Sequence, residues 1–287
     1  MKACLRVCGC CVGLVGITWL VLSSTATPAP PTSFAAAAPT ISAAHALLAH
    51  AIQANGWFEW RTNYLGSCMR TGESQYGGIT PKGMANALSG MPSPCALTPD
   101  SVFVDVGSGY GEFPFFVRAA TGFRAVGVEI DPCRHAIAMR RLRSVESLLP
   151  RGRPLTYLNV DVTAPGGSLR QLNATHVFIH STCFTKGLIK SIAHAARVAG
   201  VRCMLDLGND DVRPQLAQAF GGVPIHVARS STTWVDAGMP LFYYASRSLR
   251  KAHSLQPIDN LTRGTWRDRV KVALARQYRE ADSALGR

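Results

Sequence analysis

The chain is poor in charged residues, and acidic residues are the scarcer of the two signs. Charged residues make up 16% of its 287 residues, against roughly 25% in an average soluble protein, while apolar residues reach 47%. This composition excludes an intrinsically disordered chain and a coiled coil. Seventeen Asp and Glu oppose thirty Lys and Arg, which leaves a formal net charge of +13. Such a surplus favours a polyanionic partner, either nucleic acid or an anionic membrane surface, and says nothing about the fold.

Long hydrophobic runs are missing as well, apart from one stretch near the start. Residues 7–22 carry no charge, follow Lys2 and Arg6, and precede a run of small residues. A basic start, a short apolar run and a small-residue exit are typical of a secretory signal peptide. The run is shorter than the ~20 residues that a membrane span needs. We therefore expect residues 1–24 to be a signal peptide or signal anchor that contacts a membrane; the alternative is an apolar extension or a mis-assigned start codon.

No Cys-x-x-Cys pair occurs outside this leader, which argues against a zinc site, and we predict no metal site. Four of the nine cysteines lie in the leader. The other five are scattered and odd in number, and they are Cys68, Cys95, Cys133, Cys183 and Cys203. We expect them to be reduced thiols of the core, an expectation that is at odds with secretion.

Composition divides the rest of the chain. Uncharged Ala, Pro, Ser and Thr predict a linker over residues 25–42, and a helical cap with a loop follows over 43–98. Within this cap, Thr80 and Pro81 predict the start of a short helix, as its N-cap and first residue. The tail, 247–287, is basic, and its apolar residues recur at helical spacing, which is more typical of packing than of a ligand surface.

Residues 99–246 alternate between short apolar runs and helical stretches. This alternation predicts an α/β fold with a parallel sheet covered on both faces. The expected strands are 102–106, 125–129, 155–160, 176–180 and 201–205. Two later β-rich runs, 225–235 and 241–245, have no helix between them, so we expect an antiparallel hairpin at the sheet edge.

A glycine-rich segment follows the first expected strand. The strand ends in Asp105, and the loop that precedes the next helix consists of Gly107, Ser108, Gly109, Tyr110 and Gly111. Glycines let the chain turn sharply and let a ligand lie against bare amides. A second apolar strand ends in Glu129, which is placed to accept hydrogen bonds from both hydroxyls of a ribose. This order of features predicts a nucleoside cofactor.

Asp105 discriminates between two such cofactors. A carboxylate at this position repels the pyrophosphate of a dinucleotide but suits the sulfonium and ammonium groups of S-adenosyl-L-methionine (SAM). We therefore predict SAM as the cofactor. Asp161, after the third expected strand, lies where such folds contact the adenine amino group; the alternative is a helix N-cap.

Four sequence segments indicate a particular protein family. They are SQYGGITPKGMANAL before the glycine loop, GVEID, HVFIHSTCF and STTWVDAGMPLFYYA, within about residues 60–246. Together they resemble the non-SET histone-lysine methyltransferases, the disruptor of telomeric silencing family. The resemblance implies a class I, Rossmann-like methyltransferase with a mostly parallel seven-stranded sheet and an antiparallel edge hairpin. It also implies methyl transfer from SAM to a lysine of histone H3 in the nucleosome, by a monomeric enzyme of the nucleus.

The resemblance implies roles for individual residues. In that family a tyrosine and a threonine lie over the methionine end of the cofactor, which implies Tyr76 and Thr80 here. An aromatic channel would favour the neutral lysine amine by desolvation, and the matching residues are Phe184, Trp234, Tyr243 and Tyr244. His180 would help to remove the proton, or would be a structural hydrogen-bonding residue. Residues 180–184 replace the family's Asn-Asn-Phe-Ala-Phe, so the asparagine nearest the methyl is lost, and Ser181 joins the candidate site.

Two alternatives stay open. One is a class I methyltransferase that acts on a small molecule or another protein in an organelle or secretory compartment. The other is a non-catalytic SAM-fold module that binds a polyanion. Six arginines within residues 134–153 form either a solvated helix face or a binding patch. In the tail, the candidates for nucleic-acid contact are Arg263, Arg267, Arg269, Lys271 and Arg276.

Overall fold

The computed structural model describes residues 40–54, 78–164, 168–208, 213–222, 224–232 and 238–255. The leader, Tyr76, Trp234 and the basic tail after residue 255 are sequence predictions that lie outside these residues. Within the described part, no helix is both long and apolar enough to cross a bilayer.

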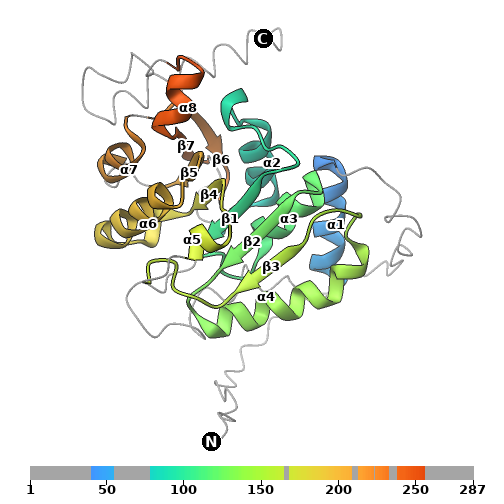
Figure 1. Ribbon diagram of the computed structural model, residues 1–287. Helices are drawn as coiled ribbons and strands as arrows, with labels where there is room; N and C mark the ends of the chain where they lie inside the picture. Colours follow the sequence, from blue (N-terminus) through green and yellow to red (C-terminus); the bar gives the residue numbers. More distant parts are fainter. Residues whose placement is uncertain are drawn as a thin grey trace, which may run out of the picture.

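Seven strands form one sheet in the order β3-β2-β1-β4-β5-β7-β6 (Figure 1). The strands are β1 (Val102–Val106), β2 (Arg124–Val128), β3 (Leu155–Leu158), β4 (His176–Ile179), β5 (Cys203–Leu207), β6 (His226–Ser230) and β7 (Met239–Ala245). The first five pair in parallel, and β7 is antiparallel to both β5 and β6. The predicted parallel sheet with an antiparallel edge hairpin is therefore confirmed.

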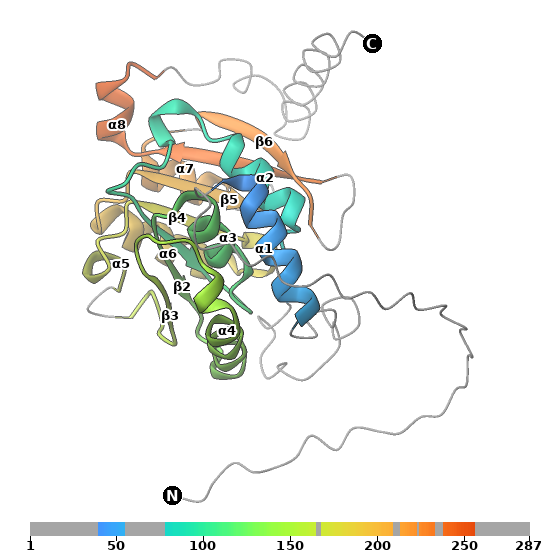
Figure 2. The same ribbon diagram turned by 90° about the vertical axis from the view of Figure 1, so that its right-hand side faces the viewer.

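Helices cover both faces of the sheet (Figures 1 and 2). One face carries α1 (Ile41–Ala54), α2 (Pro81–Ser89), α3 (Glu112–Thr121) and α4 (Pro132–Val145). The other carries α5 (Ser168–Gln171), α6 (Lys186–Val198) and α7 (Arg213–Phe220). The remaining helical segments are α8 (Arg247–Ala252) and the 3-10 turns η3 (Ser93–Cys95), η4 (Glu146–Leu148) and η5 (Ser181–Cys183).

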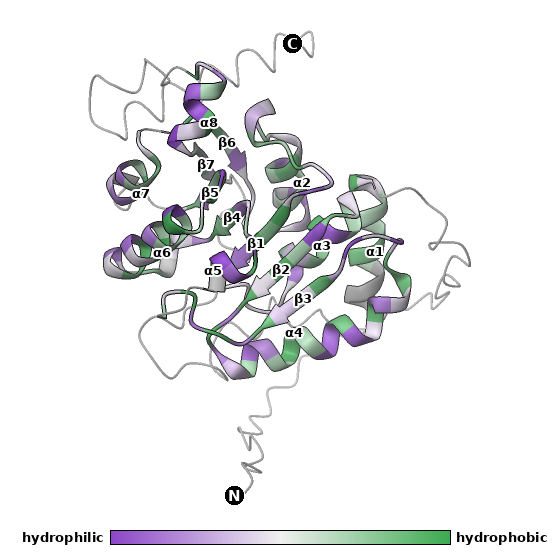
Figure 3. Ribbon diagram, viewed as in Figure 1, coloured by the Kyte–Doolittle hydropathy of each residue, from purple (hydrophilic) through white to green (hydrophobic). Residues whose placement is uncertain are grey.

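The helices begin where side-chain caps are available. The Thr80 hydroxyl accepts a hydrogen bond from the Gly83 amide, 3.0 Å away, and Pro81 follows as the first helical residue, as predicted. Asp131 caps α4 in the same way, and Thr185 caps α6. Around its axis α6 mixes hydrophilic and hydrophobic residues (Figure 3), and the buried ones face the sheet.

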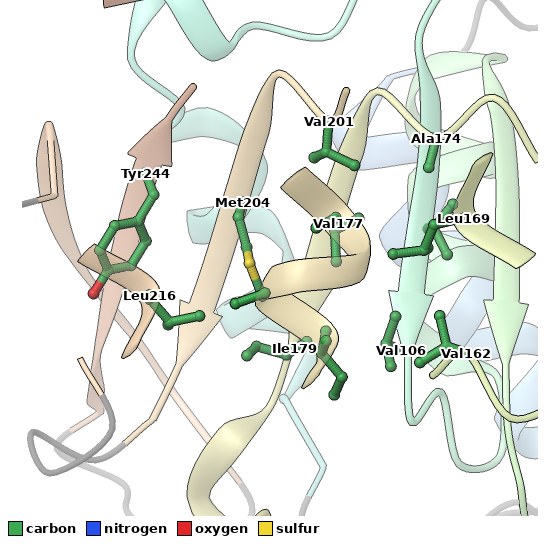
Figure 4. Close-up of a cluster of buried hydrophobic side chains, with 14 of the residues drawn as sticks. Val106, Val162, Leu169, Ala174, Val177, Ile179, Val201, Met204, Leu216 and Tyr244 are labelled. Atoms are coloured by element: carbon green, nitrogen blue, oxygen red, sulfur yellow. The ribbon is translucent and has the colours of Figure 1, made fainter. Parts of the chain in front are cut away.

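The core is divided by the sheet into two layers, because successive strand residues point to opposite faces. On the α6 side, Met204, Val177 and Ile179 belong to an apolar cluster that runs from Val106 to Tyr244 (Figure 4). On the α3 side, the rings of Phe103, Phe113 and Phe178 pack edge-to-face, with centroids 5.2 and 4.6 Å apart. These two layers position the carboxyl ends of the parallel strands.

The fifth strand lies two residues later than predicted. It runs through Asp206 to Leu207, whereas the apolar pattern had suggested residues 201–205. A carboxylate normally marks the end of a buried strand, but Asp206 is fully buried and pairs opposite Ile179 of β4. The predicted strand ended too early because Asp206 is a polar residue inside the strand.

The expectation of reduced core cysteines is wrong at two positions. Cys95 and Cys203 form a disulfide with their Cα atoms 5.7 Å apart, although 108 residues separate them in sequence. They meet because η3 packs beside the start of β5, a tertiary contact that spacing along the chain does not show. Cys133 is exposed rather than in the core.

Candidate functional site

The glycine loop makes a sharp turn between β1 and α3. Gly107, Gly109 and Gly111 have φ angles of +77°, +56° and +86°, a region that residues with a side chain rarely adopt. The amides of Gly107 and Ser108 both donate to the carbonyl of Val128, at 2.8 and 3.0 Å. These bonds fix the loop to the carboxyl end of the neighbouring strand, β2.

Glu129 is brought into the same loop, as the sequence suggested. Its Oε2 accepts a hydrogen bond from the Gly109 amide at 2.7 Å, and its Oε1 accepts one from the Asp131 amide at 2.9 Å. Its side chain is almost fully buried. The carboxylate thus supports the loop in the structure, and its contact with a ribose stays a prediction.

Negative charge is concentrated around the loop. Burial raises the pKa of Asp105, and the nearby carboxylates of Glu129 and Glu112 raise it further. Repulsion among these three groups is relieved by a cation, whereas an anionic pyrophosphate would add to it. The electrostatics therefore fit the sulfonium and ammonium groups of SAM better than a dinucleotide.

Tyr157 of β3 is a site residue that the sequence reasoning missed. Its hydroxyl donates to the Gly111 carbonyl at 2.6 Å. A Cβ on Gly111 would lie 2.7 Å from the Tyr157 ring, and a Cβ on Gly127 would lie 2.5 Å from it. The signal that pointed to this ring was Gly127, a glycine inside an apolar strand. Ser108 also packs over Gly127, so its hydroxyl points toward the sheet.

Arg141 of α4 holds the outer side of the loop. Its guanidinium pairs with Glu112 at 2.5 Å and lies over the Tyr110 ring, 4.9 Å from the centroid. For Arg141 the expectation of a solvated face or binding patch is therefore wrong, and Arg134 is buried too. The exposed arginines of this run are Arg140, Arg143, Arg151 and Arg153.

The segment after β4 lies beside the glycine loop. His180 is half-buried at the end of β4, and Ser181, the first residue of η5, is almost fully buried. The ring of Phe184 packs on the loop, because a Cβ on Gly107 would lie 2.8 Å from its Cζ. The structure thus brings the candidates His180, Ser181 and Phe184 together with the predicted cofactor loop.

The paired tyrosines do not line one channel, and this corrects the expectation. Tyr243 is fully buried on the α2 face, where its hydroxyl donates to the Ala87 carbonyl at 2.8 Å. Burial raises its pKa. Tyr244 faces the opposite layer, beside Leu216 of α7 (Figure 4). Adjacent residues of a strand cannot face the same side, which is why the pair separates.

Two cofactor candidates have other contacts in the structure. The Thr80 hydroxyl caps α2 and contacts Ser231 beside the edge hairpin. Asp161 is exposed, and its Oδ1 accepts hydrogen bonds from the amide and hydroxyl of Thr163, so it closes a turn instead of capping a helix. Their contacts with the methionine end and the adenine stay predictions.

Exposed apolar side chains flank the acids at the ends of β2 and β3. Ile130, next to Glu129, is 66% exposed, and Val160, next to Asp161, is 38% exposed. Sequence reasoning missed both, because single apolar residues after a strand are common.

Comparison with known proteins finds a resemblance to one family. The family profile described as "Histone methylation protein DOT1" matches residues 62–151, a segment that contains the glycine loop and Glu129. No curated protein sequence gave a significant match.

The solved structures that the comparison matched include methyltransferases of low sequence identity. One is the magnesium protoporphyrin IX methyltransferase ChlM from Synechocystis PCC 6803, at 13% identity and a TM-score of 0.46 over 71% of this chain and 99% of that one. Another is an RNA methyltransferase from Salinibacter ruber, at 15% identity and a TM-score of 0.38 over 56% and 86%. The sheet order, the loop with its acids and the profile match together give the chain a class I SAM-dependent methyltransferase fold that resembles the DOT1 histone methylation proteins.

Proposed function

We propose that the protein transfers a methyl group from SAM to a lysine side chain of another protein. The observation that carries the proposal is the DOT1 profile match, because it covers the segment in which Asp105, the glycine loop and Glu129 come together. The class I fold supports methyl transfer in general, and the family supports lysine as the acceptor.

The residues around the loop fit the cofactor. When bound, SAM supplies a methyl group that its sulfonium already activates. Asp105 would hold the cationic groups of SAM, and Glu129 would hold its ribose. Because the loop glycines have no side chains, SAM can lie close to the backbone of the loop. Phe184, packed on Gly107, would help to exclude water from the methyl group. The chain then needs only to align a neutral amine about 3 Å from the methyl carbon.

Histone H3 in the nucleosome is the first candidate acceptor, and the nucleus the corresponding location. The net charge of +13 supports a polyanionic partner. The tail arginines, which lie outside the described residues, would add salt-dependent attraction, about one unit of the slope of log affinity against log salt per phosphate contacted. Removing residues 256–287 tests this while sparing Leu249 of α8, which packs beside the disulfide.

A second candidate is a protein acceptor in an oxidising compartment. The observation that favours it is the Cys95–Cys203 disulfide, because disulfides persist in secreted and organelle proteins and are rare in the nucleus. The apolar leader, residues 1–24, points the same way.

Labelling with radioactive SAM separates these candidates. The full chain is incubated with nucleosomes, with free histones, and with a secretory-pathway membrane fraction, and the labelled band is identified. Label on histone H3 supports the first candidate, and label confined to the membrane fraction supports the second. SAM binding without label on any protein would overturn lysine methylation and favour the non-catalytic module.

Two glycine variants control the experiment. Gly109→Val places a side chain within the loop at a position where φ is +56°, and should abolish SAM binding and labelling. Gly200→Val makes the same substitution where φ is +75°, with no atom within 4 Å of the new Cβ. It carries the same kind of backbone strain away from the site, so a loss of SAM binding and labelling specific to Gly109→Val is assigned to the site.

A further inference from the structure

A serine hydroxyl and a carboxylate approach the same point at the carboxyl ends of β4 and β5. These strands are neighbours, with Ile179 opposite Asp206. A Cβ on Gly208 would collide with Ser181 Oγ and would lie 2.8 Å from Asp206 Oδ1. Only glycine at position 208 therefore lets the two side chains approach the same point.

Both polar groups are withdrawn from water. Ser181 is 1% exposed and Asp206 is 0% exposed. Within the part of the chain that the structure describes, Ser181 Oγ has no hydrogen-bond partner. A buried hydroxyl without a partner is costly, so such a group calls for a ligand, an ordered water or a reaction that uses it.

The position of Ser181 connects this pair with the cofactor loop. Ser181 begins η5, and three residues later Phe184 packs on Gly107. Along the chain, Ser181 is flanked by the half-buried His180 and Thr182, so it lies just beneath the surface, on the side of the loop where Phe184 packs. A lysine amine that approaches the methyl group is charged in water and must lose a proton before it attacks.

We infer that Ser181 and Asp206 receive this proton, an inference that rests on the proposed function. The acceptor ammonium donates to Ser181 Oγ, and the Ser181 hydroxyl, which makes no hydrogen bond in the described structure, turns toward Asp206 and passes its proton to that carboxylate. The freed nitrogen lone pair forms the N–C bond to the methyl carbon, and the C–S bond breaks with its electron pair on sulfur. Asp206 then releases its proton to water. The site therefore selects acceptors that carry an ammonium group.

A cofactor analogue tests the inference without knowledge of the acceptor. The probe carries a primary amine in place of the methylsulfonium group, so its ammonium lies where methyl and acceptor meet; S-adenosylhomocysteine, which lacks that amine, is the reference ligand. By calorimetry, Asp206→Asn and Ser181→Ala should weaken the amine analogue about tenfold and leave the reference unchanged, because a hydrogen bond to a charged group is lost. With a lysine substrate, both should lower kcat at unchanged SAM affinity.

Matched variants and the possible outcomes complete the design. Asp100→Asn, at an exposed acid, and Ser101→Ala, at a buried serine at the opposite end of β1, should alter neither ligand. If Asp206→Asn does not fold, Ser181→Ala carries the test, since no hydrogen bond of the described structure is broken by it. Equal affinities of the variant and the unaltered chain for the amine analogue would overturn the inference. Retained preference for the analogue without methylation of any lysine would instead overturn the proposed function.

Discussion

Glu129 has a structural task and a predicted ligand task, and the two are separable. Glu129→Ala removes the acceptor for the Gly109 amide together with the predicted ribose bonds, each worth about 1.5–3 kcal/mol. We expect SAM affinity to fall at least about tenfold by calorimetry. Glu129→Gln keeps one side-chain oxygen, so SAM affinity should fall less in this variant. Glu146→Gln, at an exposed glutamate, is the control; unchanged affinity of Glu129→Ala would contradict the ribose assignment.

His176 makes stability depend on pH. Its Nε2 donates to the Cys95 carbonyl at 3.1 Å, and burial lowers its pKa from 6.5 to about 4. Below pH 6.5 His176 binds a proton in the unfolded chain but stays neutral in the folded chain. The contribution of His176 to the free energy of unfolding is therefore complete above pH 6.5 and is lost progressively toward pH 4. The loss approaches about 3 kcal/mol. His176→Gln should flatten this dependence in denaturant titrations, whereas the exposed His253→Gln should reproduce the original curve.

At the residue scale, the site residues that could be predicted are those close to one another along the sequence. Asp105 and the glycines are consecutive, and Glu129 ends the next strand, so their meeting follows from strand order. Tyr157 contacts the glycine loop from β3, and Ser181 and Asp206 approach each other from the ends of β4 and β5. These contacts depend on how the side chains are buried. No local pattern indicates that a carboxylate inside β5 stays buried.

At the scale of elements, Arg141 couples α4 to the glycine loop. Arg141→Ala removes the partner of Glu112 and the cation over the Tyr110 ring, both partly desolvated. We expect a loss of about 1–2 kcal/mol in stability and a several-fold loss of SAM affinity, because the loop loses its outer support. Arg140→Ala, one residue away and exposed, should change neither. Indistinguishable effects of the two variants, by melting and calorimetry, would contradict the coupling.

Element boundaries were predictable where a cap or a glycine marks them. The helix over residues 112–121 lies between two left-handed glycines, and the helix over residues 186–198 follows the Thr185 cap. The placement of α2 was not predictable, since it packs on β6 of the distant edge hairpin (Figure 2). Hydrophobic periodicity shows which face of a helix is buried, but not which element covers it.

At the scale of the whole molecule, the disulfide closes most of the domain. In the chain-entropy account, a loop of 108 residues corresponds to about 4–5 kcal/mol of stability. Replacing Cys95 and Cys203 together with alanine should cost up to that amount in denaturant unfolding. SAM affinity should stay near that of the unaltered chain, because the cysteines lie at the start of β5 and the loop lies at the carboxyl end of β1. Cys133→Ser, at an exposed position, is the control; equal stability of all three proteins would contradict the assignment.

During synthesis, α2 is made well before the hairpin strands that it contacts. Ser230 donates to the Gly83 carbonyl, and Tyr243 donates to that of Ala87, so the helix is held by the last hairpin to be made. A ribosome adding about 5–20 residues per second therefore needs roughly seven to thirty seconds between making α2 and making the strands on which it rests. During that interval the apolar side of α2 has no hairpin to cover it, and a nascent chain arrested before residue 226 would expose the surface that chaperones recognise.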